Sequence, residues 1–551
     1  MGEACACPTA PATIRTPPAM TDAPNFLFII TDQQRADHLG CYGNPVLKTP
    51  HIDDLAARGT RFERFYVVDP ICMPNRSTIM TGRMPSLHGV RHNGIALSRE
   101  HTTFVGVLKA AGYRTGLIGK SHLQNMTGLP ASFGYTPPDG LDPPPPGFSD
   151  AFLGPRLGPS YDLEQPADWS DKGLSGFDES FYGFDHIELC TSHGDMVQGH
   201  YLNWLAERDP DAARKWGPEH STGSPDRPAP QARKPAVPEE LYPTAYIAER
   251  TVAWLEARAG ARSPEPFFLQ CSFPDPHHPF TPPGKYWDLY DPADVELPAS
   301  FHTRANNPIP PLQALYDEQA AGTADRSFVR PFAVTEAEAR TCIALTYGMI
   351  AFIDDAVGRI LAALDRLGLA ENTVVVFTSD HGDWMGDHGI MLKGPLHYQG
   401  LIRVPFLWAD PVGGQAPAND GLASSLDIAR SVLTRAGIAP FNGCQGQDLG
   451  PMLTGGASVH DGIMIEQTTQ RPYLGFTEPV RIRTFVDDRW RLTFWQGVPW
   501  GEMYDLENDP SERANLWDDP AHATVRAELT ERMLRTAIDL QDSAPLATGE
   551  A

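Results

Sequence analysis

Short apolar runs separated by longer amphipathic stretches dominate the hydropathy pattern of the chain. Four runs rich in β-branched and aromatic residues predict buried strands, and they are NFLFIIT at 25–31, YRTGLIG at 113–119, PFFLQCSF at 266–273 and TVVVFTS at 373–379. A helix-like stretch over about 335–367 precedes the last run. This succession predicts an α/β fold with a large mixed, mostly parallel sheet sandwiched by helices.

Each of the four runs ends on, or leads toward, a polar group that can take part in chemistry. These groups are Asp32, Lys120, His122, His277, Asp380 and His381. In open α/β sheets, ligands bind beyond the carboxyl ends of the strands. We therefore expect these side chains to surround one crevice.

Changes in composition divide the chain into three expected parts. The Pro- and Ala-rich residues 1–19 read as an extension or a disordered tail, and 20–455 as the main α/β domain. Within that domain, 125–240 is rich in Pro and Gly, which predicts long loops over the strand ends. Residues 456–551 predict a smaller α+β domain, because RIRTFVDDRWRLTFW at 481–495 reads as two strands around a turn.

The charge balance limits the partners of the protein. The 551 residues include 69 acids against 44 Lys plus Arg, a net charge of -25. Such a surface repels nucleic acid and anionic membranes, and no apolar run approaches the ~20 residues of a membrane span. We expect neither partner, although a small anion can still bind where a few cations converge.

The eight cysteines lack the regular spacing of a disulfide framework or a zinc site. Only Cys5 and Cys7 lie close together, and they are two positions apart. No secretory signal is visible, because the apolar run at 25–30 is too short for one. We expect a cytoplasmic protein.

The stretch CMPNRSTIMTG at 72–82 predicts a short helix with Cys72 just before its first turn. Pro74 suits that first turn and Gly82 suits the C-terminal cap. Unpaired N–H groups at a helix start attract anions, and Arg76 lies about one turn along. A lone cysteine is more often a small buried hydrophobe, but this pattern predicts an oxyanion site beside residue 72.

This stretch resembles the signature of the type I sulfatases, C-x-P-x-R followed by x-x-x-x-T-G. Its matching positions are Cys72, Pro74, Arg76, Thr81 and Gly82. The resemblance implies that a formylglycine-generating enzyme oxidises Cys72 to formylglycine after translation. It also implies the alkaline phosphatase-like fold of that superfamily.

Further stretches resemble other segments of this family, in the same order, from residue 25 to about 517. They are TDQQRADHLGCYGN with Asp32 and Gln33, GKSHL with Lys120 and His122, PHHPF with His277, and TSDHGDWMGDHGIMLKG with Asp380, His381 and Lys393. The family commonly has Asn where His381 stands. A His there looks more like the choline sulfatase and phosphonate monoester hydrolase branches.

The resemblance implies one divalent metal ion. Its ligands would be Asp32, Gln33 through its carbonyl, Asp380, His381 and the modified residue at position 72. Hard oxygen donors favour Ca²⁺ and an imidazole favours a transition metal such as Mn²⁺, so both ions stay open.

The resemblance also implies roles for the other site residues in the hydrolysis of a small anionic sulfate ester. Arg76, Lys120 and Lys393 would neutralise the ester oxygens. His277, with Lys393, would assist the leaving oxygen, and His122 would act as the base that releases sulfate.

Three alternative functions draw on the same residues. A phosphonate monoester or phosphodiester hydrolase would use the same groups, and an inactive relative would keep the fold without turnover. A thiol phosphatase fits poorly, because its Cys-to-Arg spacing differs and it needs no metal carboxylates. The sequence does not identify the alcohol portion of the substrate, and we expect a homo-oligomer.

Overall fold

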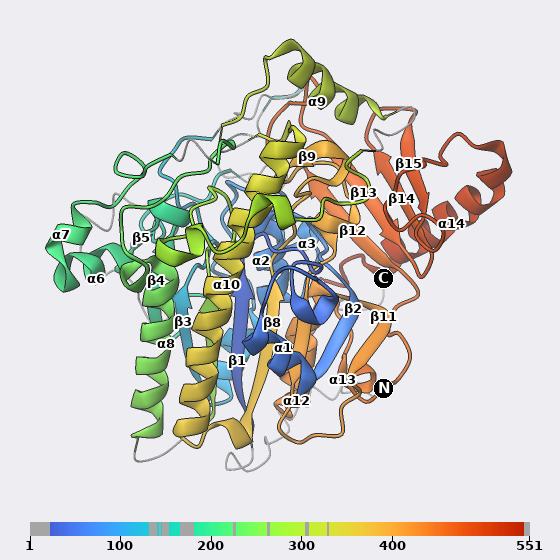
Figure 1. Ribbon diagram of the computed structural model, residues 1–551. Helices are drawn as coiled ribbons and strands as arrows, with labels where there is room; N and C mark the ends of the chain where they lie inside the picture. Colours follow the sequence, from blue (N-terminus) through green and yellow to red (C-terminus); the bar gives the residue numbers. More distant parts are fainter. Residues whose placement is uncertain are drawn as a thin grey trace, which may run out of the picture.

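Nine strands of the described chain form one sheet, in the order β11-β2-β10-β8-β1-β6-β3-β4-β5 (Figure 1). Their bounds are β1 Asn25–Thr31, β2 Thr60–Tyr66, β3 Arg114–Gly119, β4 His186–Thr191, β5 Gln198–Gly199, β6 Phe267–Ser272, β8 Thr373–Ser379, β10 Phe406–Ala409 and β11 Ala418–Ser424. The computed structural model describes residues 23–131, 140–142, 145, 154–165, 181–223, 227–261, 265–302, 308–327 and 330–544. The expected extension at 1–19 lies outside these ranges.

The four strands predicted from the sequence are consecutive neighbours in this sheet, in the order β8-β1-β6-β3, and all run parallel. In the centre, Phe28 of β1 is opposite Val376 of β8 on one side and Gln270 of β6 on the other. The strands β10 and β5 pair antiparallel with their neighbours, so the sheet is mixed. The predicted fold class is confirmed.

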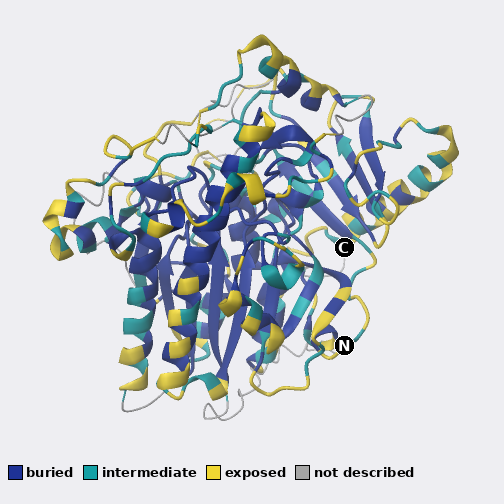
Figure 2. Ribbon diagram, in the orientation of Figure 1, coloured by how far each residue is buried: buried dark blue, intermediate teal, exposed yellow. Residues whose placement is uncertain are grey.

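Helices cover both faces of the sheet, because successive side chains of a strand point to opposite sides. The residues Phe26, Phe28 and Ile30 pack into one core with α4 (Phe104–Ala110) and α12 (Ile428–Arg435). The alternate residues Leu27 and Ile29 pack into a second core with α8 (Pro243–Ala259) and α10 (Glu336–Arg366). Figure 1 shows α8 and α10 side by side across this face, and Figure 2 shows the strands behind them buried.

The helix α10 confirms the helical prediction over about 335–367. Thr335 and Glu338 form a capping box at its start, each side chain bonding the other's backbone N–H. By length and hydropathy alone α10 could span a membrane, but 89% of its apolar window is buried inside the fold. It packs against the sheet as a core helix.

Further helices, a second sheet and a two-stranded sheet of β7 (Phe332–Ala333) and β9 (Ile390–Met391) complete the described chain. The main remaining helices are α1 (Pro50–Ala57), α2 (Cys72–Thr81), α6 (His200–Arg208), α9 (Pro310–Ala321) and α14 (Ala523–Asp539). The second sheet is antiparallel, with the strands β12 (Ile463–Thr468), β13 (Arg481–Val486), β14 (Trp490–Trp495) and β15 (Gly501–Asp505). The pair β13–β14 is the hairpin expected at 481–495.

Buried polar contacts join the second sheet to the loop that follows Lys393. His397 makes hydrogen bonds of 2.8 Å to Thr484 Oγ1 and 2.8 Å to Gln467 Oε1. The N–H of Gln399 donates to Glu512 Oε2 at 2.7 Å, and Glu512 also pairs with Arg491. The C-terminal part of the chain therefore holds the loop that follows Lys393 in place.

The stretch 125–240 holds more regular structure than its composition predicts. It contributes β4, which pairs parallel with β3 and extends the main sheet, as well as the helix α6. The run HIELCT of β4 carries His186 and Glu188 among its apolar residues and lies between the Pro-rich segments at 142–147 and 224–238. Because of these features, the hydropathy pattern does not predict β4 as a strand.

Candidate active site

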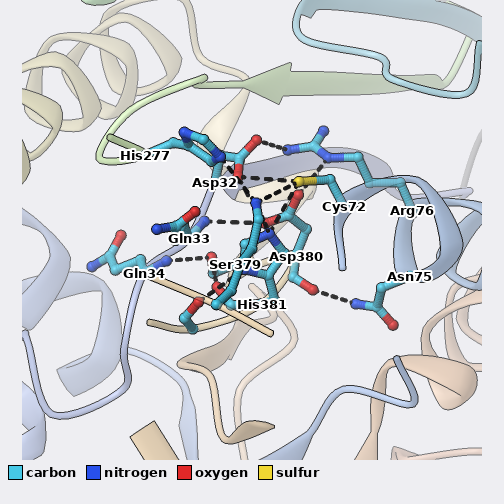
Figure 3. A network of polar contacts seen from close by, with 12 residues as sticks. Asp32, Gln33, Gln34, Cys72, Asn75, Arg76, His277, Ser379, Asp380 and His381 are labelled. Carbon is cyan, nitrogen blue, oxygen red and sulfur yellow. Dashed lines mark hydrogen bonds and ion pairs between the residues drawn. The ribbon is translucent and has the colours of Figure 1, made fainter. Parts of the chain in front are cut away.

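The carboxyl ends of the four central strands meet at one buried cluster of polar side chains (Figure 3). Backbone bonds hold the residues that follow these strands: the N–H of Asp380 donates to Thr31 O at 3.2 Å, and that of Lys120 to Ser272 O at 3.0 Å. Asp32 follows β1 directly. The strand ends therefore bring these groups together, as expected from the sequence.

The helix α2 brings Cys72 and Arg76 into the same cluster. The helix begins at Cys72, one residue earlier than the sequence predicts, because Ile71 takes the N-cap position without a side-chain cap. Gly82 ends the helix in the left-handed conformation at φ 61°, as expected. Asn75 fixes the helix against β8 by donating to Asp380 O at 2.6 Å.

Arg76 is buried, and the nitrogen atoms of its guanidinium group donate hydrogen bonds to residues at the ends of several strands. Its Nε donates to Asp380 Oδ2 at 2.7 Å, while Nη1 donates to Lys120 O and Ser272 Oγ at 3.1 and 3.0 Å. Its Nη2 lies 3.6 Å from Asp32 Oδ2 and has no hydrogen-bond partner among the described residues. That donor suits an anionic ligand.

The donor set fits a divalent cation. One atom each from Asp32, Cys72, Asp380 and His381 lie within 4.8 Å of one another, and all four residues are buried. Two buried carboxylates this close need positive charge to offset their repulsion. Oxygen donors with an imidazole match Ca²⁺ or Mn²⁺, as the sequence predicts.

Gln33 lies beside this set in a left-handed conformation at φ 63°. Its Nε2 bonds Asp383 Oδ2 at 2.5 Å and His278 Nδ1 at 2.9 Å, which orients the amide. Its Oε1 is buried and has no hydrogen-bond partner among the described residues. A free carbonyl oxygen here is the atom expected of Gln33 as a metal ligand.

Two lysines supply positive charge to the surroundings of Cys72. Lys120 forms a buried ion pair with Asp32. Lys393 Nζ lies 3.0 Å from Cys72 Sγ, 2.9 Å from His277 Nε2 and 3.1 Å from His381 Nε2. The cations expected to gather an anion therefore lie in one cluster with residue 72.

These charges shift the titration of the cluster. Burial would raise the pKa of Asp32, but Lys120 and His277 hold that pKa well below its usual value. Burial and Asp32 would raise the pKa of the Cys72 thiol, yet Lys393 and Lys120 lower it overall. Burial and Lys120 hold the pKa of His122 well below its usual value. At neutral pH the carboxylate of Asp32 is thus charged and the imidazole of His122 neutral.

His193 belongs to the cluster although the sequence analysis did not single it out. Its Nε2 lies 2.7 Å from Lys120 Nζ, and its ring stacks on that of His277 with centroids 3.6 Å apart. It follows β4, whose run ends in Ser-His-Gly-Asp much as β8 ends in Ser-Asp-His-Gly-Asp. Recognition of β4 as a strand would have exposed that signal.

Two family descriptions match the chain. "Sulfatase" matches residues 24–438, and "N-sulphoglucosamine sulphohydrolase, C-terminal" matches 386–539. Together they cover both sheets.

Individual relatives are similar over nearly the full length. An arylsulfatase of Clostridium perfringens is 29% identical, covering 90% of this chain and 90% of that protein. A choline-sulfatase of Rhizobium meliloti is 26% identical, covering 93% and 85%. The crystal structure of a phosphonate monoester hydrolase of Agrobacterium radiobacter superposes with a TM-score of 0.72 at 26% identity, covering 94% and 96%.

Proposed function

Because the chain belongs to the sulfatase family of sulfuric ester hydrolases, we propose that it hydrolyses sulfate monoesters with the side chain at position 72 as nucleophile. A formylglycine-generating enzyme would first convert Cys72 to formylglycine. The observation that supports this proposal best is the gathering of three cations in one buried cluster: Lys393 contacts Cys72, and Arg76 and Lys120 pair with Asp32 beside it. A cationic pocket of this kind binds a tetrahedral anion within an otherwise acidic protein.

A divalent ion completes this pocket in the proposed enzyme. Held by Asp32, Asp380, His381, the Gln33 carbonyl and the modified residue at 72, it would supply Lewis-acid polarisation of the ester and lower the pKa of the attacking hydroxyl. Arg76 offers its unpartnered Nη2 to a sulfate oxygen. Lys120 and Lys393 bind the remaining oxygens from either side.

Proton transfer falls to the histidines that adjoin these cations. His277 and Lys393, in contact at 2.9 Å, together supply the proton that the leaving oxygen requires. His122, whose Nδ1 has no hydrogen-bond partner among the described residues, accepts the proton whose removal releases sulfate. Its neutral imidazole suits a base.

A second candidate is the hydrolysis of phosphonate monoesters or phosphodiesters at the same site. Two observations favour it: the buried ligand cluster contains His381, where the family commonly has Asn, and the superposed phosphonate monoester hydrolase covers nearly the whole fold. Both reactions transfer a group with a tetrahedral anionic centre. The site residues alone do not rank them.

One preparation tests both candidates. We expect kcat/KM for an aryl sulfate to exceed that for an aryl phosphonate, and a large preference for the phosphonate would reverse the order. Cys72→Ala should lower both activities roughly 1,000-fold or more. The mass of the peptide spanning residue 72 should be that of the aldehyde, which is lighter than the thiol, and fully active protein with a free thiol would refute the proposal.

A further inference from the structure

A buried glutamate from the Pro-rich stretch binds the backbone of the segment that carries His122. Glu164 is 1% exposed. Its Oε2 accepts the N–H of His122 at 2.8 Å, and its Oε1 accepts those of Leu123 and Gln124 at 3.0 Å each. One carboxylate thus takes three consecutive backbone donors, which is a strong arrangement in a low-dielectric interior.

The backbone at this place depends on such an acceptor. The strand β3 ends at Gly119, and the bond from Lys120 N to Ser272 O is the last one that joins this segment to the sheet. His122 then turns into the left-handed conformation at φ 58°, which a non-glycine residue adopts only where its surroundings impose it. The N–H groups of His122, Leu123 and Gln124 would lose these partners if Glu164 were absent.

The segment that carries Glu164 is itself tied to the His122 segment. The side chain of Gln124 accepts the N–H of Leu163 at 3.1 Å and donates to Ser160 O at 2.9 Å. Because bonds run in both directions, residues 160–164 and 122–124 form one rigid unit. This part of the Pro-rich stretch therefore holds the segment that carries His122, in addition to any contact that the stretch makes with substrate.

We propose that Glu164 is a positioning residue: its carboxylate fixes the left-handed turn at His122 and so aims this imidazole at residue 72. The proposal rests on the proposed function only for the role of His122 as base. A purely structural role for Glu164 would instead lower stability without acting through His122. Enzyme kinetics and backbone exchange separate these two roles.

The kinetic test is a double-mutant cycle on the full chain after conversion of Cys72. Glu164→Ala should lower kcat roughly 100-fold, as expected for a displaced catalytic group, with a smaller change in KM. Glu164→Gln keeps one acceptor oxygen and should lose less. The double variant Glu164→Ala, His122→Ala should be no slower than His122→Ala alone, because both changes remove the same function.

The double-mutant cycle has a matched control variant and defined outcomes that would overturn the proposal. Asp162→Asn changes a half-buried acid two positions away and should keep wild-type kcat. Should Glu164→Ala fail to fold, Glu164→Gln carries the cycle. A kcat within about threefold of wild type for the Glu164 variant, or full additivity with His122→Ala, would overturn the proposal.

Hydrogen exchange tests the proposal without any substrate. In Glu164→Ala the amides of residues 122–124 should exchange faster than in wild type, whereas amides of the neighbouring strand β3 should not change. Unchanged exchange at 122–124 would refute the positioning role. A wild-type protein that hydrolyses no ester would instead refute the proposed function, while the exchange difference would still report on Glu164.

Discussion

Lys393 and Cys72 are 321 positions apart in the chain, yet Lys393 Nζ lies 3.0 Å from Cys72 Sγ. The same ammonium contacts His277, so one cation lies between the proposed nucleophile and the proposed proton donor. Lys393 follows the short strand β9 (Ile390–Met391), and Leu392 before it is in the left-handed region at φ 74°. The turn directs this side chain into the site.

Replacement of Lys393 should affect poor leaving groups most. Lys393→Ala should lower kcat/KM about 100- to 1,000-fold, because a charge aimed at the developing oxyanion is removed. The loss should be larger for an alkyl sulfate than for an aryl sulfate, whose leaving oxygen needs less help. Lys285→Ala changes an exposed lysine and is the control. An equal loss with both esters would contradict a role at the leaving oxygen.

Metal removal should lower thermal stability as well as activity. The carboxylates of Asp32 and Asp380 lie close together in the interior, so a cation that binds only the folded state stabilises it. At 100 times the dissociation constant this amounts to about 2.7 kcal/mol. Thermal melts after chelation and on titration with Ca²⁺ or Mn²⁺ measure the effect. A melting temperature that changes neither on chelation nor on addition of the metal ion would argue against the metal site. In the control variant Asp380→Asn, the added ion should raise the melting temperature less than in wild type.

His193 should contribute to turnover through its contacts with Lys120 and His277. We expect His193→Ala to lower kcat between about 10- and 100-fold, because both neighbours lose a contact that orients them. Separate measurement of kcat, KM and the melting temperature distinguishes this effect from unfolding. His220→Ala, at an exposed histidine, should be neutral. Unchanged kcat in the His193 variant would remove it from the site.

The pair His460–Asp427 should make stability depend on pH. The Nε2 atom of His460 lies 2.9 Å from both carboxylate oxygens of Asp427. Burial lowers the pKa of His460, but the carboxylate raises it above its usual 6.5 overall. The pair therefore contributes stability that is fully present below pH 6.5 and is lost as pH rises through the folded-state pKa.

The variant His460→Gln keeps a hydrogen-bond donor without the charge. Denaturant unfolding should show it less stable than wild type by about 1 kcal/mol at pH 6, with the difference shrinking toward pH 9. A difference that is the same at both pH values would show that charge plays no part. Activity at pH 7 should change little, since His460 does not touch the site residues.

The fold and most of the site could be predicted from the sequence because their signals are local. Four short runs rich in apolar residues predicted the central strands, and the groups at their carboxyl ends led us to expect that Asp32, Lys120 and Asp380 meet. Gly82 and Pro74 placed the helix that carries Arg76 to within one residue. The order of these stretches along the chain carried the family resemblance.

What the sequence did not reveal depends on contacts between distant segments. Glu164 lies in a loop without periodicity, and only its three bonds across about forty positions identify it. His193 was missed along with β4, whose apolar pattern is interrupted by charged residues. A single acidic residue or histidine forms no recognisable motif with its neighbours in the sequence. Only the structure shows which distant residues it contacts.

The bonds that His397 and Gln399 make to the second sheet set a limit on shortened versions of this protein. A chain cut after β11 would retain every strand of the large sheet. It would nevertheless lose Thr484, Gln467 and Glu512, which bind the loop that follows Lys393. Protein engineers seeking a minimal catalyst should therefore keep both sheets and place fusion partners elsewhere.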